Sequence, residues 1–270
     1  MRYLRDTLYQ EVDAGHGITA FKLTDWPNED TGCVSWEEAI ANMLHGEQPK
    51  ASVPWSNGAT TPVILKVNAL KYPSQRVRAL LGIQRDGRYE WATAEIHTAL
   101  QMQGKPYIPK LYAYGWSKTR FGMPDRIFSI TEFLSETKSV EEIARDEESS
   151  EIALRLALDT FRQAIDDGLL HLDPWAGNCL ISDDQKKCWL VDLEFSKLNS
   201  QTPIEHTLGF CCGFFYKGSI TKRFTPLEYR GFVADWFSQA LPNRNLQLFI
   251  EKMDFYMNNH VKRKRRFAAF

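Results

Sequence analysis

The stretch HLDPWAGNCLISDDQKKCWLVDLEFS, from His171 to Ser196, constrains the fold more than any other part of this chain. Two short apolar runs, at 179–181 and 188–191, enclose polar residues that favour a turn, so the stretch predicts a β-hairpin. Asn178 stands directly before the first run and Asp192 directly after the second. Because the strands of a hairpin are antiparallel, the start of one lies beside the end of the other. The hairpin is therefore expected to bring these two polar side chains together.

The polar residues around this hairpin suit phosphoryl transfer. Asp173 could hold an attacking hydroxyl in line or accept its proton. Asn178 and Asp192 offer the oxygen ligands that Mg²⁺ prefers, and the cation would bridge the phosphates of a nucleotide. His171 is expected to brace the loop rather than to take the proton. Each of these residues alone could be an ordinary loop or strand-end residue, but the ordered set favours the functional interpretation.

A lysine completes the pattern upstream. Lys66 interrupts the apolar run at 63–67, which is typical of a buried strand. A lysine there either carries its ammonium to solvent along the strand or pairs with an acidic side chain. The segment at about 88–103 predicts a helix, in which Glu95 is the better candidate partner and Glu90 the second choice. A lysine held in this way could reach the α- and β-phosphates of a nucleotide.

These motifs resemble those of the protein-kinase-like superfamily, and in particular its small-molecule branch, which contains the choline kinases and the aminoglycoside phosphotransferases. The resemblance covers about residues 63–196. The segments that carry it are VILK ending at Lys66, the glutamate Glu95, FSITEFL at 128–134, HLDPWAGN at 171–178 and VDLE at 191–194. It implies a two-lobed α+β fold with ATP and Mg²⁺ as cofactors, and transfer of the γ-phosphoryl group of ATP to a hydroxyl acceptor.

The resemblance also implies a division of the chain and a place for the nucleotide base. The backbone groups of Glu132 and Leu134 would lie beside adenine, in the hinge between the lobes. The expected parts are an extension with the start of the small lobe at 1–60, a β-rich N-lobe at 61–132, a larger helical C-lobe at 133–260 and a basic tail at 261–270.

The sequence after the hairpin favours a small-molecule acceptor. Asp192-Leu193-Glu194 resembles the D-x-E pattern of choline-kinase-like phosphotransferases rather than the D-F-G of protein kinases. Lipopolysaccharide-core kinases also resemble this chain in having D-L here, so a sugar or lipid-linked hydroxyl stays open. Only residues 193–201 separate Asp192 from the sequence TPIE, which is too short for a peptide-docking activation segment. Trp175 and Glu194 are candidate residues for acceptor selectivity.

Two other functions stay open, and the first is supported by the absence of a glycine-rich G-x-G-x-x-G loop before Lys66. The stretch at 55–60 is interpreted as a turn between two strands. A pseudokinase, acting as a nucleotide-binding or interaction module, is the first alternative, and an atypical protein kinase is the second. The acidic run at 145–148 could attract a cationic substrate, although a solvated helix face is the preferred interpretation.

Composition limits the partners. The 33 basic and 34 acidic side chains leave a formal net charge of −1, so binding to nucleic acid is not expected. Five cysteines show no metal-ligand spacing, which argues against zinc, and no run of 18 apolar residues predicts a membrane span. A cytoplasmic location is expected. The basic run Lys262 to Arg266 is interpreted as a solvated, frayed tail, with a nuclear address as the alternative. The oligomeric state cannot be derived from the sequence.

Overall fold

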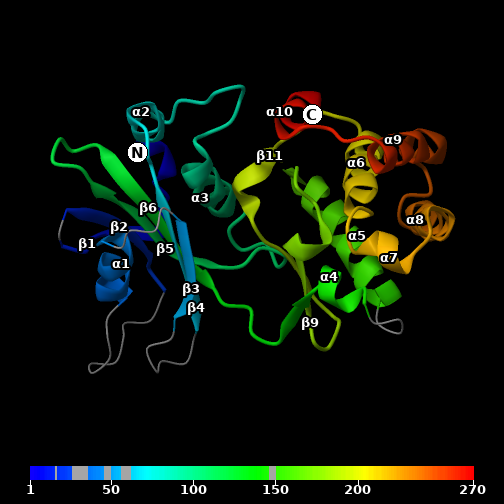
Figure 1. The fold of residues 1–270 in the computed structure, drawn as a ribbon, viewed down its shortest axis with the longest axis horizontal. Coiled ribbons are helices and arrows are strands. Elements are labelled where there is room, and N and C mark those ends of the chain that lie inside the picture. The colour runs from blue at the N-terminus through cyan, green and yellow to red at the C-terminus, as the bar shows by residue number, and fades with distance from the viewer. Residues whose placement is uncertain (16, 26–35, 46–49, 56–61, 146–149) are drawn as a thin grey trace. The chain divides into compact units, whose positions relative to one another are not determined.

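The computed structural model describes residues 1–15, 17–25, 36–45, 50–55, 62–145 and 150–270, which form two compact units (Figure 1). The first unit is Met1–Leu134 and the second is Ser135–Phe270. The predicted turn at 55–60, apart from Trp55, and most of the acidic run at 145–148 lie outside the described residues.

An antiparallel six-stranded sheet forms the framework of the first unit. Its strand order is β1-β2-β5-β6-β4-β3. The strands are β1 (Tyr9–Asp13), β2 (Ile18–Leu23), β3 (Lys50–Trp55), β4 (Val63–Ala69), β5 (Leu111–Lys118) and β6 (Pro124–Glu132). The region before residue 60 therefore supplies three strands of this sheet.

The helices of the first unit pack on this sheet. They are η1 (Arg2–Leu4), α1 (Trp36–His45), α2 (Pro73–Leu81) and α3 (Trp91–Gln101), the last of which falls within the helix predicted at about 88–103. Helix α1 contacts β4, and α3 contacts β5 and β6. In β4, the buried residues Val63, Leu65 and Val67 alternate with the partly exposed Ile64 and Lys66. Because side chains alternate across a strand, Lys66 leaves the sheet on the face opposite to these buried residues.

The second unit is mainly helical. Its small sheets have the orders β10-β9-β7 and β11-β8. The predicted hairpin at 179–191 is confirmed, since β9 and β10 pair antiparallel. The strands are β7 (Thr137–Ser139), β8 (Leu169–His171), β9 (Cys179–Ser182), β10 (Cys188–Leu190) and β11 (Ser196–Leu198). The helices are α4 (Val140–Ile143), α5 (Ser150–Asp166), η2 (Ala176–Asn178), η3 (Leu193–Phe195), α6 (Ile204–Phe215), α7 (Ile220–Arg223), α8 (Pro226–Ala240), α9 (Leu246–Asn258) and α10 (Arg263–Ala269).

Helices α6 and α9 form the most extensive helix pair of the second unit. Two glycines of α6 permit their close approach. A Cβ atom at Gly209 would lie 2.9 Å from the backbone oxygen of Phe249, and one at Gly213 would lie 2.3 Å from that of Met253. Real Cβ atoms do not approach backbone oxygens this closely, so larger residues at these positions would force the helices apart.

The basic run at the C-terminal end is not a frayed tail, and that prediction was wrong. Residues Arg263–Ala269 form α10, in which Arg266 is only 5% exposed and Phe267 is buried. Phe270 is buried as well, and its ring lies 4.9 Å from that of Phe210 in α6. Its backbone oxygen accepts a hydrogen bond from Ser200. The apolar residues at the end of the run anchor the helix, so Arg266 is held against the unit while residues 262–265 are exposed.

None of the helices in the described residues is long and apolar enough to cross a lipid bilayer.

Candidate active site

The lysine and glutamate predicted to pair do so in the first unit. Lys66 Nζ in β4 lies 2.6 Å from Glu95 Oε1 in α3, and the two side chains are 22% and 15% exposed. Glu90, the second choice, instead accepts hydrogen bonds from Arg78 at 2.6 Å and from Gln75 at 3.1 Å. Charges that are this far removed from water are stable only when paired. The Lys66 ammonium is thus held in one position by a partner on another element.

In the segment predicted to contact adenine, two backbone N–H groups already donate hydrogen bonds to other backbone carbonyls. The Glu132 N–H donates to the Lys110 carbonyl at 2.8 Å, and the Phe133 N–H donates to the Pro62 carbonyl at 3.2 Å. The Glu132 carboxylate accepts from the Lys110 N–H at 3.2 Å. These N–H groups are therefore not available to a base. Contacts from the Glu132 carbonyl or from Leu134 stay predictions.

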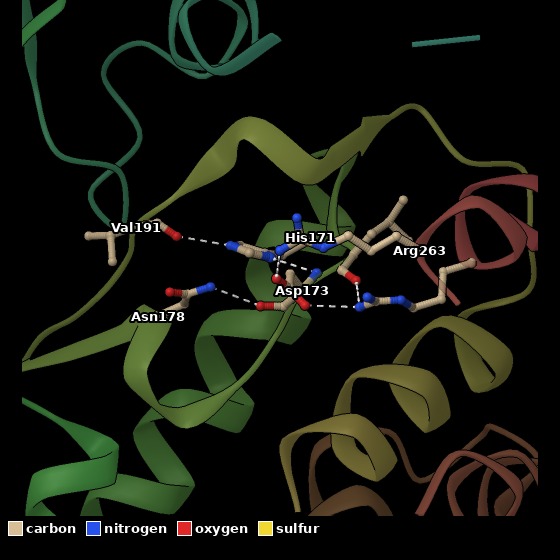
Figure 2. A network of polar contacts seen from close by, with 7 residues as sticks. His171, Asp173, Asn178, Val191 and Arg263 are labelled. Atoms are coloured by element: carbon tan, nitrogen blue, oxygen red, sulfur yellow. Dashed lines mark hydrogen bonds and ion pairs between the residues drawn. The ribbon is translucent and has the colours of Figure 1, made fainter. Parts of the chain in front are cut away.

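His171 occupies the end of β8 and is buried, with 2% exposure (Figure 2). Its Nε2 lies 3.0 Å from the Val191 carbonyl, and its Nδ1 accepts a hydrogen bond from the Asp173 N–H at 3.1 Å. An imidazole that donates from Nε2 and accepts at Nδ1 is the neutral tautomer. Burial lowers the pKa of His171, which also favours the neutral ring. Both nitrogens are committed to the backbone, so His171 braces the loop and has no free nitrogen for a proton in transit.

Asp173 is held by two arginines of α10, as Figure 2 shows for Arg263. Arg263 Nη2 lies 2.6 Å from Oδ2, and Arg266 Nη1 lies 3.0 Å from Oδ1. Arg266 also donates to the Leu172 carbonyl. Burial by itself raises the pKa of Asp173, but the hydrogen bonds from Arg266 and Arg263 outweigh it, and the pKa lies below its ordinary value. Asp173 is therefore a carboxylate at neutral pH and a weak base.

Neither arginine was predicted from the sequence to be a site residue. The sequence does indicate that they share one helix face, because Arg263 and Arg266 are three residues apart and apolar residues follow them. Nothing in the sequence, however, indicates that this face meets residue 173, about ninety positions earlier in the chain. A short basic run is more often solvated than buried, so the sequence alone favours a solvated tail.

Asn178 and Asp192 lie at the hairpin end where the sequence placed them. The Asn178 side-chain amide donates to the Asp173 backbone oxygen at 3.0 Å, and Figure 2 shows its Oδ1 turned away from that contact. The Val191 N–H donates to the Asn178 carbonyl at 3.0 Å, which joins the loop to the strand end before Asp192. Asp192 has φ +60°, a left-handed conformation that is uncommon outside glycine and clusters at functional sites.

These two residues fit a hard cation. A fixed amide oxygen and a partly exposed carboxylate are oxygen ligands of the kind that Mg²⁺ takes. Within the described part of the chain, no group of three or more His, Cys, Asp or Glu side chains is placed to hold a metal alone. Magnesium bound by Asn178 and Asp192 would therefore need further ligands, such as nucleotide phosphates and water. Glu194, in η3, is partly exposed between the buried residues Leu193 and Phe195.

Trp175 lies in the loop that follows β8 and has 41% of its surface exposed. Its indole packs on Gly177, where a Cβ atom would lie 2.5 Å from the ring. Gly177 therefore lets the indole lie flat against the loop. An exposed aromatic surface close to Asp173 keeps Trp175 a candidate for acceptor selectivity.

No protein-family model matches the chain, and no curated protein is similar to it in sequence. Solved structures that are similar in fold include the following three. WaaP in complex with acyl carrier protein is 16% identical with a TM-score of 0.49, and the match covers 81% of this chain and 87% of that chain. The kinase PK-1 of Cydia pomonella granulovirus is 15% identical with a TM-score of 0.38, over 61% of this chain and 59% of its own.

The third structure, WbdD with a kinase inhibitor, is 13% identical with a TM-score of 0.44, over 72% of this chain and 41% of its own. This chain therefore spans less than two thirds of the second and third proteins. The predicted α+β fold, with a β-rich first part and a helical second part, is confirmed. Any activity has to be inferred from the site residues, because matches at this level carry no information about chemistry.

Proposed function

We propose that this chain is an ATP-dependent phosphotransferase that transfers the γ-phosphoryl group of ATP to a hydroxyl of a small molecule. The ion pair between Lys66 and Glu95, at 2.6 Å, is the observation that carries the proposal. A lysine on a sheet strand, held by a glutamate on a neighbouring helix, is the arrangement by which kinases orient nucleotide phosphates. Residues 171–192 supply the other half of the pattern.

Each site residue then has a distinct role. Lys66 binds the α- and β-phosphates while Glu95 keeps its ammonium in place. Asn178 and Asp192 would hold Mg²⁺, which would neutralise charge on the nucleotide phosphates. His171 fixes the backbone of the loop. The carbonyl of Glu132 and the backbone of Leu134 contact the adenine.

Asp173 positions the acceptor. In the reaction, a bond forms between the acceptor oxygen and the γ-phosphorus, and the bond from that phosphorus to the bridging oxygen of ADP breaks. The hydroxyl proton leaves through the Asp173 carboxylate to solvent. Since the pKa of Asp173 is low, this carboxylate orients the hydroxyl by accepting its hydrogen bond and takes little of the proton before the phosphorus is attacked.

A pseudokinase is the second candidate, because both carboxylate oxygens of Asp173 already have arginine partners. In that function the loop would be closed to acceptors, and the chain would act by binding nucleotide or a partner. A protein kinase has less support, since α6 begins at Ile204, shortly after Asp192. A cytoplasmic location stays a prediction. Entry into the nucleus is not supported, since Arg263 and Arg266 in the basic run are engaged at Asp173.

Thermal and chemical unfolding with and without MgATP tests the proposal. A ligand present at a hundred times its dissociation constant stabilises the folded chain by about 2.7 kcal/mol. We expect a saturable stabilisation of the wild type by MgATP. Asp192→Ala should lose the part that depends on Mg²⁺, and Glu95→Gln should weaken nucleotide binding by about tenfold, as expected for about 1.4 kcal/mol.

Asp183→Ala is the matched control, because Asp183 is exposed in the turn of the same hairpin, at the end away from Asp192. It should respond to MgATP as the wild type does. No stabilisation of the wild type by MgATP at any concentration would refute the proposed function. Stabilisation without turnover of any hydroxyl compound would favour the pseudokinase.

A further inference from the structure

Two arginines occupy the carboxylate that the proposed function assigns to the acceptor. Arg266 Nη1 is 3.0 Å from Oδ1 of Asp173, and Arg263 Nη2 is 2.6 Å from Oδ2 (Figure 2). Each oxygen therefore has its own cationic donor. A hydroxyl that binds to Asp173 must share an oxygen with an arginine or take its place.

The two arginines differ in how firmly they are held. Arg266 is 5% exposed, donates also to the Leu172 carbonyl, and lies 4.5 Å from the centre of the Phe214 ring. Moving it would leave a buried charge without a partner, which is strongly unfavourable. Arg263 is 55% exposed in its side chain, and its guanidinium also lies 5.5 Å from the centre of the Phe195 ring. An ion pair with one exposed partner contributes little to stability, so Arg263 can leave Asp173 at small cost.

An anion is the natural replacement partner for Arg263. A guanidinium binds phosphate or carboxylate through two parallel hydrogen bonds, a geometry that its single contact to Asp173 does not use. An ammonium group approaching Asp173 would meet Arg263 and Arg266, which disfavours the amino alcohols and aminoglycosides that the sequence resemblance suggests.

We propose that Arg263 is an acceptor-binding residue, and that the acceptor is a hydroxyl compound that carries a phosphate or carboxylate group. The anion of the acceptor draws the Arg263 guanidinium away from Asp173, and Oδ2 then accepts the hydrogen bond of the hydroxyl. The same contact that blocks Asp173 in the free protein thus selects the acceptor. This inference rests on the proposed function and names its substrate class.

Isothermal titration calorimetry with three related sugars tests it: glucose 6-phosphate, glucose and glucosamine. The wild type should bind glucose 6-phosphate saturably, and at least tenfold more tightly than the neutral or the cationic sugar. Arg263→Gln should weaken glucose 6-phosphate binding at least tenfold, whereas Arg263→Lys should weaken it less. The matched control is Arg265→Gln, which removes the same charge from an exposed position of the same helix and should bind as the wild type does.

The proposal is overturned if glucose 6-phosphate does not bind, if the three sugars bind equally, or if Arg263→Gln and Arg265→Gln have the same effect. It is also overturned if Arg263→Gln accelerates transfer to all three sugars alike, since α10 would then be an inhibitory contact and not part of the acceptor site. MgATP is titrated separately into each protein. If the wild type does not bind MgATP, the proposed phosphotransferase function is refuted. If it binds MgATP but Arg263→Gln does not change glucose 6-phosphate binding, only the proposed acceptor class is refuted.

Discussion

Replacing Asp173 by asparagine should destabilise the second unit, in addition to any effect on activity. The substitution keeps the size of the side chain and removes its charge. Arg266, which is 5% exposed, would keep the Leu172 carbonyl but lose its counter-ion, and the nearby Arg263 would add repulsion. Breaking a buried ion pair costs about 3–5 kcal/mol and an exposed pair at most about 1 kcal/mol. Because the Asp173 side chain is itself 15% exposed, we expect a loss between these two values and close to the first, about 2–3 kcal/mol.

Urea denaturation at pH 7, followed by circular dichroism, measures this loss. About 2–3 kcal/mol corresponds to an unfolding equilibrium constant that is roughly 30- to 150-fold larger. Asp184→Asn is the control, because it breaks an exposed ion pair with Lys186 at 3.3 Å and should barely move the midpoint. A double variant with Arg266→Met should recover most of the loss, since the buried charge that lost its partner is then gone.

The pH dependence checks the same reasoning. Since the folded-state pKa of Asp173 lies below its ordinary value of 3.8, the stabilisation is complete above that value and is lost as the pH falls toward the folded-state pKa. The difference between the wild type and Asp173→Asn should therefore shrink at strongly acidic pH. An Asp173→Asn variant that is as stable as the wild type, or more stable, at pH 7 would refute the role given to Arg266.

Two further predictions concern packing and the loop histidine. In urea denaturation, Gly213→Ala should lower the free energy of unfolding by about 1–3 kcal/mol, because its Cβ atom crowds α9. Gly231→Ala is the control, because a Cβ atom there meets nothing within 4 Å, and it should be neutral or stabilising. Equal effects of the two substitutions would contradict the close approach of α6 and α9. Burial lowers the pKa of His171, so the free energy of unfolding should fall as the pH drops below its ordinary value of 6.5. His171→Gln should reduce that slope between pH 7.5 and 5.5 but not abolish it, because burial also lowers the pKa of His97 and His206. Parallel curves for the two proteins would contradict this role of His171.

The fold class, the hairpin and the partner of Lys66 were predictable because each depends on local pattern. Alternation of apolar and polar residues identifies a strand, and a helix about thirty residues later offers a limited choice of carboxylates. The choice of Glu95 over Glu90 could be made from the sequence, and Glu90 has a different use, in the pair with Arg78. The brace made by His171 followed from its place beside the loop, although the hydrogen bond to Val191 did not.

The sheet order and the C-terminal helix were not predictable, because both depend on contacts between distant residues. Strands β1 and β2 join the sheet through β5, about ninety positions later, and no local pattern specifies that partner. Arg266 is buried because Asp173 and Leu172 receive its donors and aromatic rings surround it. Composition describes the run at 262–266 only as basic, and a basic run can be solvated or buried.

The imidazole of His171 links two backbone positions that belong to different parts of the site. One nitrogen contacts the carbonyl of Val191, next to Asp192, and the other receives the N–H of Asp173. The spacing between Asp173, the proposed acceptor-binding residue, and the segment proposed to bind the metal is therefore set by the width of one aromatic ring. A ring cannot be compressed or stretched, so any displacement of the strand end would carry the loop with it. The positions of both Asp173 and Asp192 would then depend on one uncharged side chain that does not itself contact a substrate.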